Sequence, residues 1–246
     1  MASRVIEVES RRESARALSV VMGYMAIGLL VTAISCFGFS FWFASLYSEA
    51  QAAGPLSEEI MTQKLLFVMV GAMVALVILN FVMSITLLKA KKGAWIPYLL
   101  YTAIMGLMLA PFVMWIDFAT LGTAFGITSA VFLILFLIGY FSKADLTPLA
   151  LIGLGLLFSV IFVPLPFLIL YFINPIAWPI WNCLAALICA VVIMLFVSFD
   201  ANQMNRAIQG GVFTNNLALY YAYTFYCDFI MIFIRILMIL ASSKRK

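Results

Sequence analysis

Two aspartates lie in stretches of sequence that are otherwise almost entirely hydrocarbon. Asp200 ends the apolar run Leu184–Phe199, and Asp228 lies inside the next run, Leu217–Leu240. A carboxylate at membrane depth costs about 2.5 to 3.5 kcal/mol on insertion scales, so it usually faces the interior of a helix bundle or a water-filled cavity. These two side chains are therefore the first candidates for a functional site.

The chemistry available to such a pair is proton exchange and calcium binding. Two carboxylates held close in a low-dielectric environment cannot both ionise cheaply, so they titrate as a unit. A shared proton would form a strong hydrogen bond between two helices, and its gain or loss would change how they pack. Carboxylate oxygens are also the hard ligands that calcium prefers, which predicts transient calcium binding by Asp200 and Asp228. Their approach requires that 201–215 fold back or that the last helix start deeper.

Other polar side chains share the helical face of Asp228. Tyr221 lies seven residues and Thr224 four residues before it, and Arg235 lies seven residues after it. These spacings fall on one side of a helix, as a polar stripe at the centre of a bundle would. Arg235 is about 10 Å from Asp228 along the axis, so we expect it to pair with another acid or to extend outward. In the structural alternative, Asp228 pairs with a polar neighbour only to fix packing, and Asp200 merely ends a helix.

The composition indicates an integral membrane protein and not an enzyme. Of the 246 residues, 66% are hydrophobic and 10% are charged, against about 25% charged in soluble domains. With no histidine in the chain, a proton switch must use carboxylates. The four cysteines fall in apolar runs without disulfide or metal-ligand spacing. No nucleophile–base set or phosphate-binding loop occurs, so we expect no cofactor, no nucleic-acid partner and a lipid bilayer as the surroundings.

Seven apolar segments reach the roughly 20 residues that a spanning helix needs. They are 18–46, 63–88, 94–115, 121–141, 148–172, 178–200 and 216–241. The sequence thus predicts an all-α polytopic membrane protein with an arm at 1–17, one domain at 18–241 and a tail at 242–246. Only the connections 47–62 and 201–215 exceed ten residues, and Pro164 and Pro166 predict a kink in the fifth segment.

The basic residues predict a cytoplasmic N-terminus under the positive-inside rule. One side collects Arg4, Arg11, Arg12, Arg16, Lys89, Lys91, Lys92, Lys143 and Arg206, and the other has only Lys64. Seven crossings place the tail outside, against the rule, so either the last segment is re-entrant or the tail follows the earlier helices. The short loops favour a bacterial inner membrane.

Two further acids lie in short connections. Asp117 follows Trp115, and Asp145 precedes Thr147-Pro148, which has the pattern of an N-cap followed by a first helical residue. We expect both carboxylates to be solvated.

Three stretches carry a resemblance to a known family. The first is 21–32 (VMGYMAIGLLVT), and the second is 124–132 (AFGITSAVF) with Gly139-Tyr140 and 143–146 (KADL). The third and best is 199–203 (FDANQ) followed by 225–233 (FYCDFIMIF). In this order and spacing, the chain resembles the Bax inhibitor-1, or transmembrane Bax inhibitor motif, family.

The resemblance implies a fold, an activity and a site. The fold is six helices around a central seventh, and the family includes pH-sensitive calcium leak channels that acid opens. The two gating aspartates of such channels correspond to Asp200 and Asp228. Met231 stands where the family often has asparagine, and Arg235 is nearer to the second aspartate than the family's arginine. No basic residue lies between Phe67 and Leu88, where many members have the partner of the first aspartate, so the closed-state latch is expected to differ.

Three functions remain compatible with the sequence. The first is a passive calcium leak gated by a proton, with calcium as the permeant ion. The second is a regulator of a membrane protease, or of cell-death and stress signalling, that binds a membrane protein through 1–17. The third is a proton-coupled transporter with the aspartates as the relay.

Overall fold

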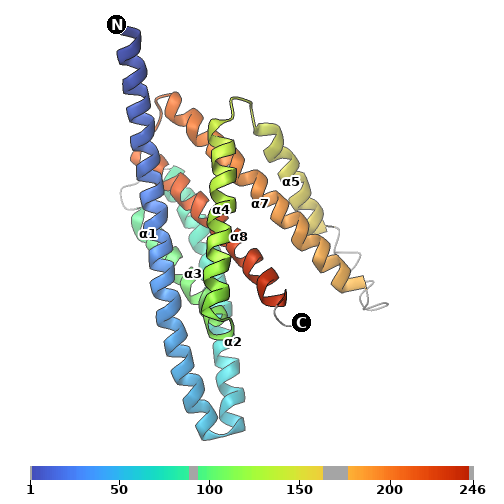
Figure 1. Ribbon diagram of the computed structural model, residues 1–246. Coiled ribbons are helices and arrows are strands. Elements are labelled where there is room, and N and C mark those ends of the chain that lie inside the picture. Colours follow the sequence, from blue (N-terminus) through green and yellow to red (C-terminus); the bar gives the residue numbers. More distant parts are fainter. Residues whose placement is uncertain (1, 89–93, 163–176, 244–246) are drawn as a thin grey trace. The chain divides into compact units, whose positions relative to one another are not determined.

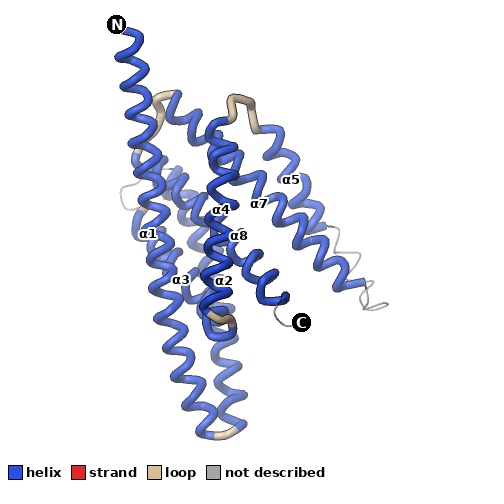
Figure 2. The backbone as a smooth tube through the Cα atoms, viewed as in Figure 1, coloured by secondary structure: helices blue, strands red, loops and turns tan. Residues whose placement is uncertain are grey.

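The protein is entirely helical in the part of the chain that the structure describes. The computed structural model describes residues 2–88, 94–162 and 177–243 (Figure 1; Figure 2), and these contain no strand. The helices are α1 Ala2–Ala53, α2 Pro55–Leu88, α3 Trp95–Trp115, α4 Phe118–Phe141, α5 Thr147–Phe162, α7 Ala177–Gln209 and α8 Asn215–Ser243.

Six of the described helices are long and apolar enough to cross a membrane, namely α1, α2, α3, α4, α7 and α8. The fifth predicted segment, 148–172, is represented by α5, and its Pro164 and Pro166 lie outside the described residues. On α2, large apolar side chains such as Phe67, 76% exposed, and Phe81, 67% exposed, point away from the protein. Such a surface suits lipid, and the protein is an integral membrane protein.

The two long predicted connections are wrong, because most of their residues are helical. In place of a loop at 47–62, α1 and α2 are separated by Gly54 alone, which has φ of 108°. Glycine adopts this left-handed conformation without a steric penalty, and Pro55 is suited to the first helical position. In place of a loop at 201–215, α7 continues to Gln209 and turns at Gly210 and Gly211, the latter with φ of 67°. The apolar runs predicted the helices but not their ends, because the helices extend into polar sequence.

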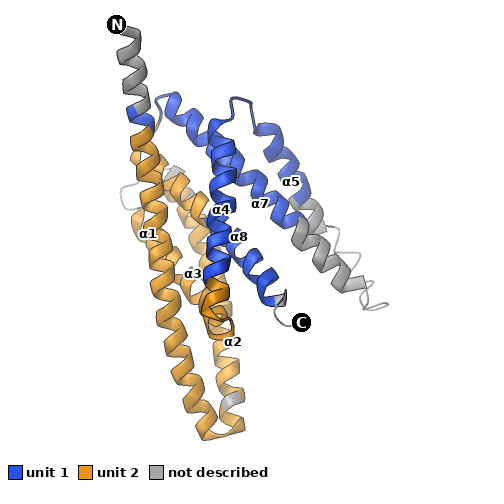
Figure 3. Ribbon diagram, viewed as in Figure 1, with its two compact units in different colours: residues 1–14, 122–212, 227–246 blue, residues 15–121, 213–226 orange. Residues whose placement is uncertain are grey.

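The described chain divides into two compact units (Figure 3). Unit 1 contains 122–212 and 227–246 with the first 14 residues, and unit 2 contains 15–121 and 213–226. The first three turns of α8 therefore belong to unit 2 and its remainder to unit 1. The arrangement of six helices around a central one stays a prediction.

Unit 2 is held together by close contacts between α1 and α3 and by α8. Thr32 on α1 donates its hydroxyl to Gly28 O and Thr102 O, both at 3.0 Å. The Thr32 hydroxyl also forms a hydrogen bond with the Tyr226 hydroxyl of α8, in which either oxygen can be the donor. A Cβ on Gly106 would lie 2.6 Å from Thr32 O, so α1 and α3 touch through backbone here.

In unit 1, α7 packs against α4 and α5, and the second half of α8 packs against α4. The ring of Phe196 on α7 lies against Gly153 of α5. The Phe229 ring of α8 meets Phe125 and Phe132 of α4 edge-on, with ring centroids 5.4 and 5.7 Å apart. Edge-to-face pairs at such distances stabilise a core beyond the area that they bury. This unit contains both candidate aspartates.

Candidate functional site

The structure places Asp200 inside α7 and Asp228 inside α8, both within unit 1. Asp200 does not end its helix, as the apolar pattern suggested, because α7 continues through a polar turn to Gln209. The alternative in which Asp200 is only a terminal interfacial residue therefore loses its premise. Asp228 lies in the middle of α8, as expected.

The two acids are close enough to interact electrostatically. Each side chain is half-buried as a whole, but Oδ2 of Asp228 is inaccessible and has no hydrogen-bond partner among the described residues. A buried carboxylate oxygen without a donor is costly, and a proton, a water or a cation would relieve that cost. Both residues that the sequence singled out thus lie in unit 1, and their role as a paired site stays a prediction.

The other members of the predicted polar stripe do not join this pair. The Tyr221 ring stacks on Phe213 and Phe225, with centroids 6.5 and 6.3 Å apart. Thr224 donates its hydroxyl to the backbone oxygen of Tyr220 in its own helix, at 3.1 Å. Both belong to unit 2. Arg235 is half-buried in unit 1 and forms no ion pair with any acid that the structure describes.

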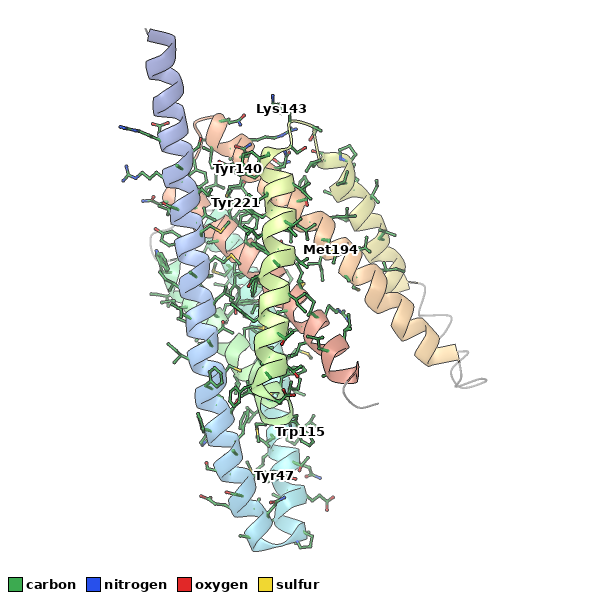
Figure 4. The ribbon with its side chains drawn as sticks, in the orientation of Figure 1. Tyr47, Trp115, Tyr140, Lys143, Met194 and Tyr221 are labelled. Carbon is green, nitrogen blue, oxygen red and sulfur yellow. The ribbon has the colours of Figure 1, made fainter. Side chains whose placement is uncertain are left out.

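Sequence reasoning missed a row of polar side chains on α7 that binds the end of α4. The donors Ser198, Asn202, Asn205 and Arg206 reach the backbone oxygens of Leu135, Gly139, Tyr140, Ser142 and Ala144, at 2.7 to 3.3 Å. Figure 4 shows Tyr140 and Lys143 at this end of α4. The last carbonyls of a helix have no partner within it, so α7 caps α4 from the side. The signal available was the spacing of polar residues at 198, 202, 205 and 206 along one helical face.

The loop after α4 is tied to α7 by an ion pair. Arg206 Nη1 lies 3.3 Å from Asp145 Oδ1, and Nη2 donates to Ala144 O at 3.1 Å. The same Asp145 oxygen accepts from Thr147 N and from Thr147 Oγ1, at 3.1 and 2.7 Å. These two hydrogen bonds, and then the Arg206 charge, lower the pKa of Asp145 below its ordinary value.

The two loop acids, Asp117 and Asp145, are exposed to solvent, as expected, and each also caps a helix. Asp145 is 59% exposed ahead of α5, but Thr147 is the first helical residue and Asp145 is its cap. Asp117 is exposed and accepts from Thr120 N at 3.0 Å and from Thr120 Oγ1 at 2.8 Å, which caps α4. Short acids before a helix are favoured for this reason.

A resident metal centre finds no support in the described ranges. They contain no group of three or more His, Cys, Asp or Glu side chains that could hold an ion. Calcium takes six to eight oxygen ligands, so two aspartates would supply only part of a coordination shell.

Comparison with known proteins gives the family. The long apolar helices define an integral membrane protein, and the family model for the inhibitor of apoptosis-promoting Bax1 matches residues 15–245. An uncharacterized protein of Chlamydia muridarum (strain MoPn / Nigg) is 26% identical over 245 residues, which cover 93% of this chain and 92% of that protein. The chain belongs to the Bax inhibitor-1 family, and the resemblance in its sequence is confirmed.

Proposed function

We propose that the protein is a calcium leak channel gated by a proton that Asp200 and Asp228 share. The observation that carries this proposal is the electrostatic interaction of the two carboxylates across α7 and α8. Two neighbouring acids in a low-dielectric site exchange protons as one coupled unit. A change in their charge would therefore alter the electrostatic interaction between these two helices.

Burial of the Asp228 carboxylate supports the same proposal. Its Oδ2 accepts no hydrogen bond from the residues described, so a proton on either acid would supply the missing donor. With both acids ionised, the oxygens repel each other and attract a cation. Following the family resemblance, we take acid to open the path and calcium to pass along it.

The orientation proposed for this channel has a cytoplasmic N-terminus in a bacterial inner membrane. The basic loop after α4 and the end of α7 lie together, because Arg206 binds Asp145 and the Ala144 oxygen. Their proximity agrees with the assignment of Lys143 and Arg206 to one side of the membrane by the positive-inside rule.

Calcium flux into liposomes that contain the purified protein tests the proposal. The parent protein should conduct more as the pH falls, and Asp200→Asn and Asp228→Asn should each flatten that dependence while keeping the fold. Asparagine retains the shape but does not titrate in this range. The double variant should add little, because the two residues act as one site.

Asp117→Asn provides the matched control, since it removes one carboxylate from an exposed helix cap and leaves the pair intact. Its pH profile should follow that of the parent. An unchanged profile in both single variants of the pair would remove the gate and leave a packing role for Asp228. Effects of the two single variants that simply add would indicate independent carboxylates.

A regulatory function is the second candidate, and the N-terminal arm favours it. The arm continues α1, which begins at Ala2, and its described side chains Arg12, Glu13 and Arg16 are exposed. Removal of residues 2–11 should then abolish binding to a membrane protein partner without changing calcium flux. A proton-coupled transporter would instead move protons in step with its substrate, which flux measured with a pH dye would detect.

A further inference from the structure

The acid on α7 lies between two residues that bind α4. Ser198 donates its hydroxyl to Leu135 O at 3.1 Å. Asn202 uses both hydrogens of its amide, donating to Gly139 O at 3.3 Å and to Ser142 O at 2.8 Å. Asp200 is two residues from each of them, so it projects from the opposite side of the helix, about 200° away.

The contact between α4 and α7 at this level is backbone against backbone. A Cβ on Gly139 would overlap the carbonyl oxygen of Ser198, so only glycine permits this approach. Asn202 is 1% exposed, and its Oδ1 accepts no hydrogen bond from the described residues. An amide held so tightly leaves α7 little freedom to rotate against α4.

We infer that Asn202 is a positioning residue for the carboxylate pair: by fixing the rotation of α7 on α4, it sets the separation of Asp200 from Asp228. The inference rests on the proposed function only in taking this pair as the switch. Loss of the amide would remove the hydrogen bonds to Gly139 O of α4 and to Ser142 O just after it, and would allow α7 to turn, which carries Asp200 away from α8. The electrostatic coupling of the two acids would fall in consequence.

Other ionisable groups stand on the helices of unit 1, but the charged group that acts on Asp228 is Asp200. Among the residues of these helices whose side chains the structure describes, the remaining groups are Tyr140 on α4, Cys189 and Arg206 on α7, and Cys227 and Arg235 on α8. Arg206 is engaged with Asp145 at the far end of α7.

A double-mutant cycle read by infrared titration tests the inference without any flux measurement. The carboxyl band of the full-length purified protein is assigned to Asp200 by its loss in Asp200→Asn. The shift in its titration midpoint on Asp228→Asn measures the coupling of the two acids. We expect that shift to fall by roughly half or more when the same change is made in an Asn202→Ala background.

Asn205→Ala is the control, because it also removes an amide bond from α7 to α4, the 2.7 Å bond to Tyr140 O, but lies further along the helix. It should leave the coupling unchanged. If Asn202→Ala does not fold, Ser198→Ala replaces it and should reduce the coupling by a smaller amount.

Each outcome bears on a different statement. If the parent shows coupling and the Asn202→Ala background shows the same coupling, the positioning role is overturned and the proposed gate stays intact. The same holds for the Ser198→Ala background where that variant is used. Equal loss in Asn205→Ala means general loosening and also overturns it. An absence of coupling in the parent removes the pair itself, and with it both the inference and the gate.

Discussion

At the residue scale, Asp145 shows how an exposed acid can be tied to its surroundings without being buried. Its pKa is lowered first by the two hydrogen bonds from Thr147 and then by Arg206. Because the folded pKa lies below the ordinary value of 3.8, the ionised group stabilises the fold above that pH. This contribution is lost as the pH falls through the folded pKa.

The measurable consequence is a pH-dependent difference between the parent and Asp145→Asn. Asparagine still accepts a hydrogen bond from Thr147 N, so only the charge is lost. The parent should melt at a slightly higher temperature than the variant near neutral pH, and the two should converge in acid. The effect should be small because both partners of the ion pair are substantially exposed. A difference that grows on acidification would contradict the assignment.

Arg235 gives a second prediction for a single side chain. Arg235 is half-buried and forms no ion pair with a described acid. Folding of the protein should therefore not depend on the shape of the guanidinium group. Arg235→Lys should be tolerated, with an unchanged yield of monodisperse protein by size-exclusion chromatography. Loss of folded protein would instead reveal a bidentate contact, which lysine cannot reproduce.

At the element scale, the crossing of α4 and α7 depends on the absence of one side chain. Gly139→Ala places a methyl group against the backbone of Ser198, which cannot move aside as a flexible side chain could. Overpacking of this kind costs about 1–3 kcal/mol. We expect a lower melting temperature and a weaker α4–α7 contact in Gly139→Ala.

Gly126→Ala on the same helix is the matched control, because a Cβ there meets nothing within 4 Å. Alanine is favoured over glycine in a helix by about 0.8–1.0 kcal/mol, so this variant should be neutral or slightly more stable. Equal destabilisation by both changes would mean that α4 tolerates alanine at neither glycine. The close approach of α4 and α7 would then not explain the effect of Gly139→Ala.

The helices also show which parts of the molecule sequence patterns could predict. Apolar runs predicted the six helices that are long and apolar enough to span a membrane, because hydrocarbon solvent selects strongly for composition. They could not locate the ends of α1, α2 and α7, where only Gly54 and the Gly210–Gly211 turn break polar but helix-compatible sequence. Composition marks the solvent around a helix, whereas the end of a helix depends on backbone conformation.

The candidate site divides in the same way. Asp200 and Asp228 were predictable because an acid in hydrocarbon is costly and therefore rare. The hydrogen bonds of Asn202 were not, since the partners are backbone oxygens that every residue has. Tyr221 and Thr224 lie on the same helical face as Asp228 by spacing. Their side chains, however, contact a backbone oxygen of their own helix and nearby rings.

At the scale of the whole molecule, the orientation in the membrane can be measured directly. In a cysteine-free background, Ala2→Cys and Lys143→Cys should be protected from an impermeant thiol reagent in intact cells. Ala53→Cys, which is exposed next to the turn at Gly54, should react. The predictions for Ala2→Cys and Lys143→Cys rest on the positive-inside rule. The prediction for Ala53→Cys rests on one membrane crossing between the N-terminus and residue 53. Reversed labelling would invert the topology.

The joined helices α1 and α2 have a practical use in imaging (Figure 1). With 52 residues, α1 is about 78 Å long, whereas the hydrocarbon core of a bilayer is about 30 Å thick. A helix of this length extends beyond the lipid, and at its polar C-terminal end Gly54 joins it to α2, where an added side chain would meet nothing within 4 Å. A short peptide epitope inserted at this tip would give an antibody fragment a firm attachment, and with it a landmark for aligning electron-microscope images of so small a membrane protein.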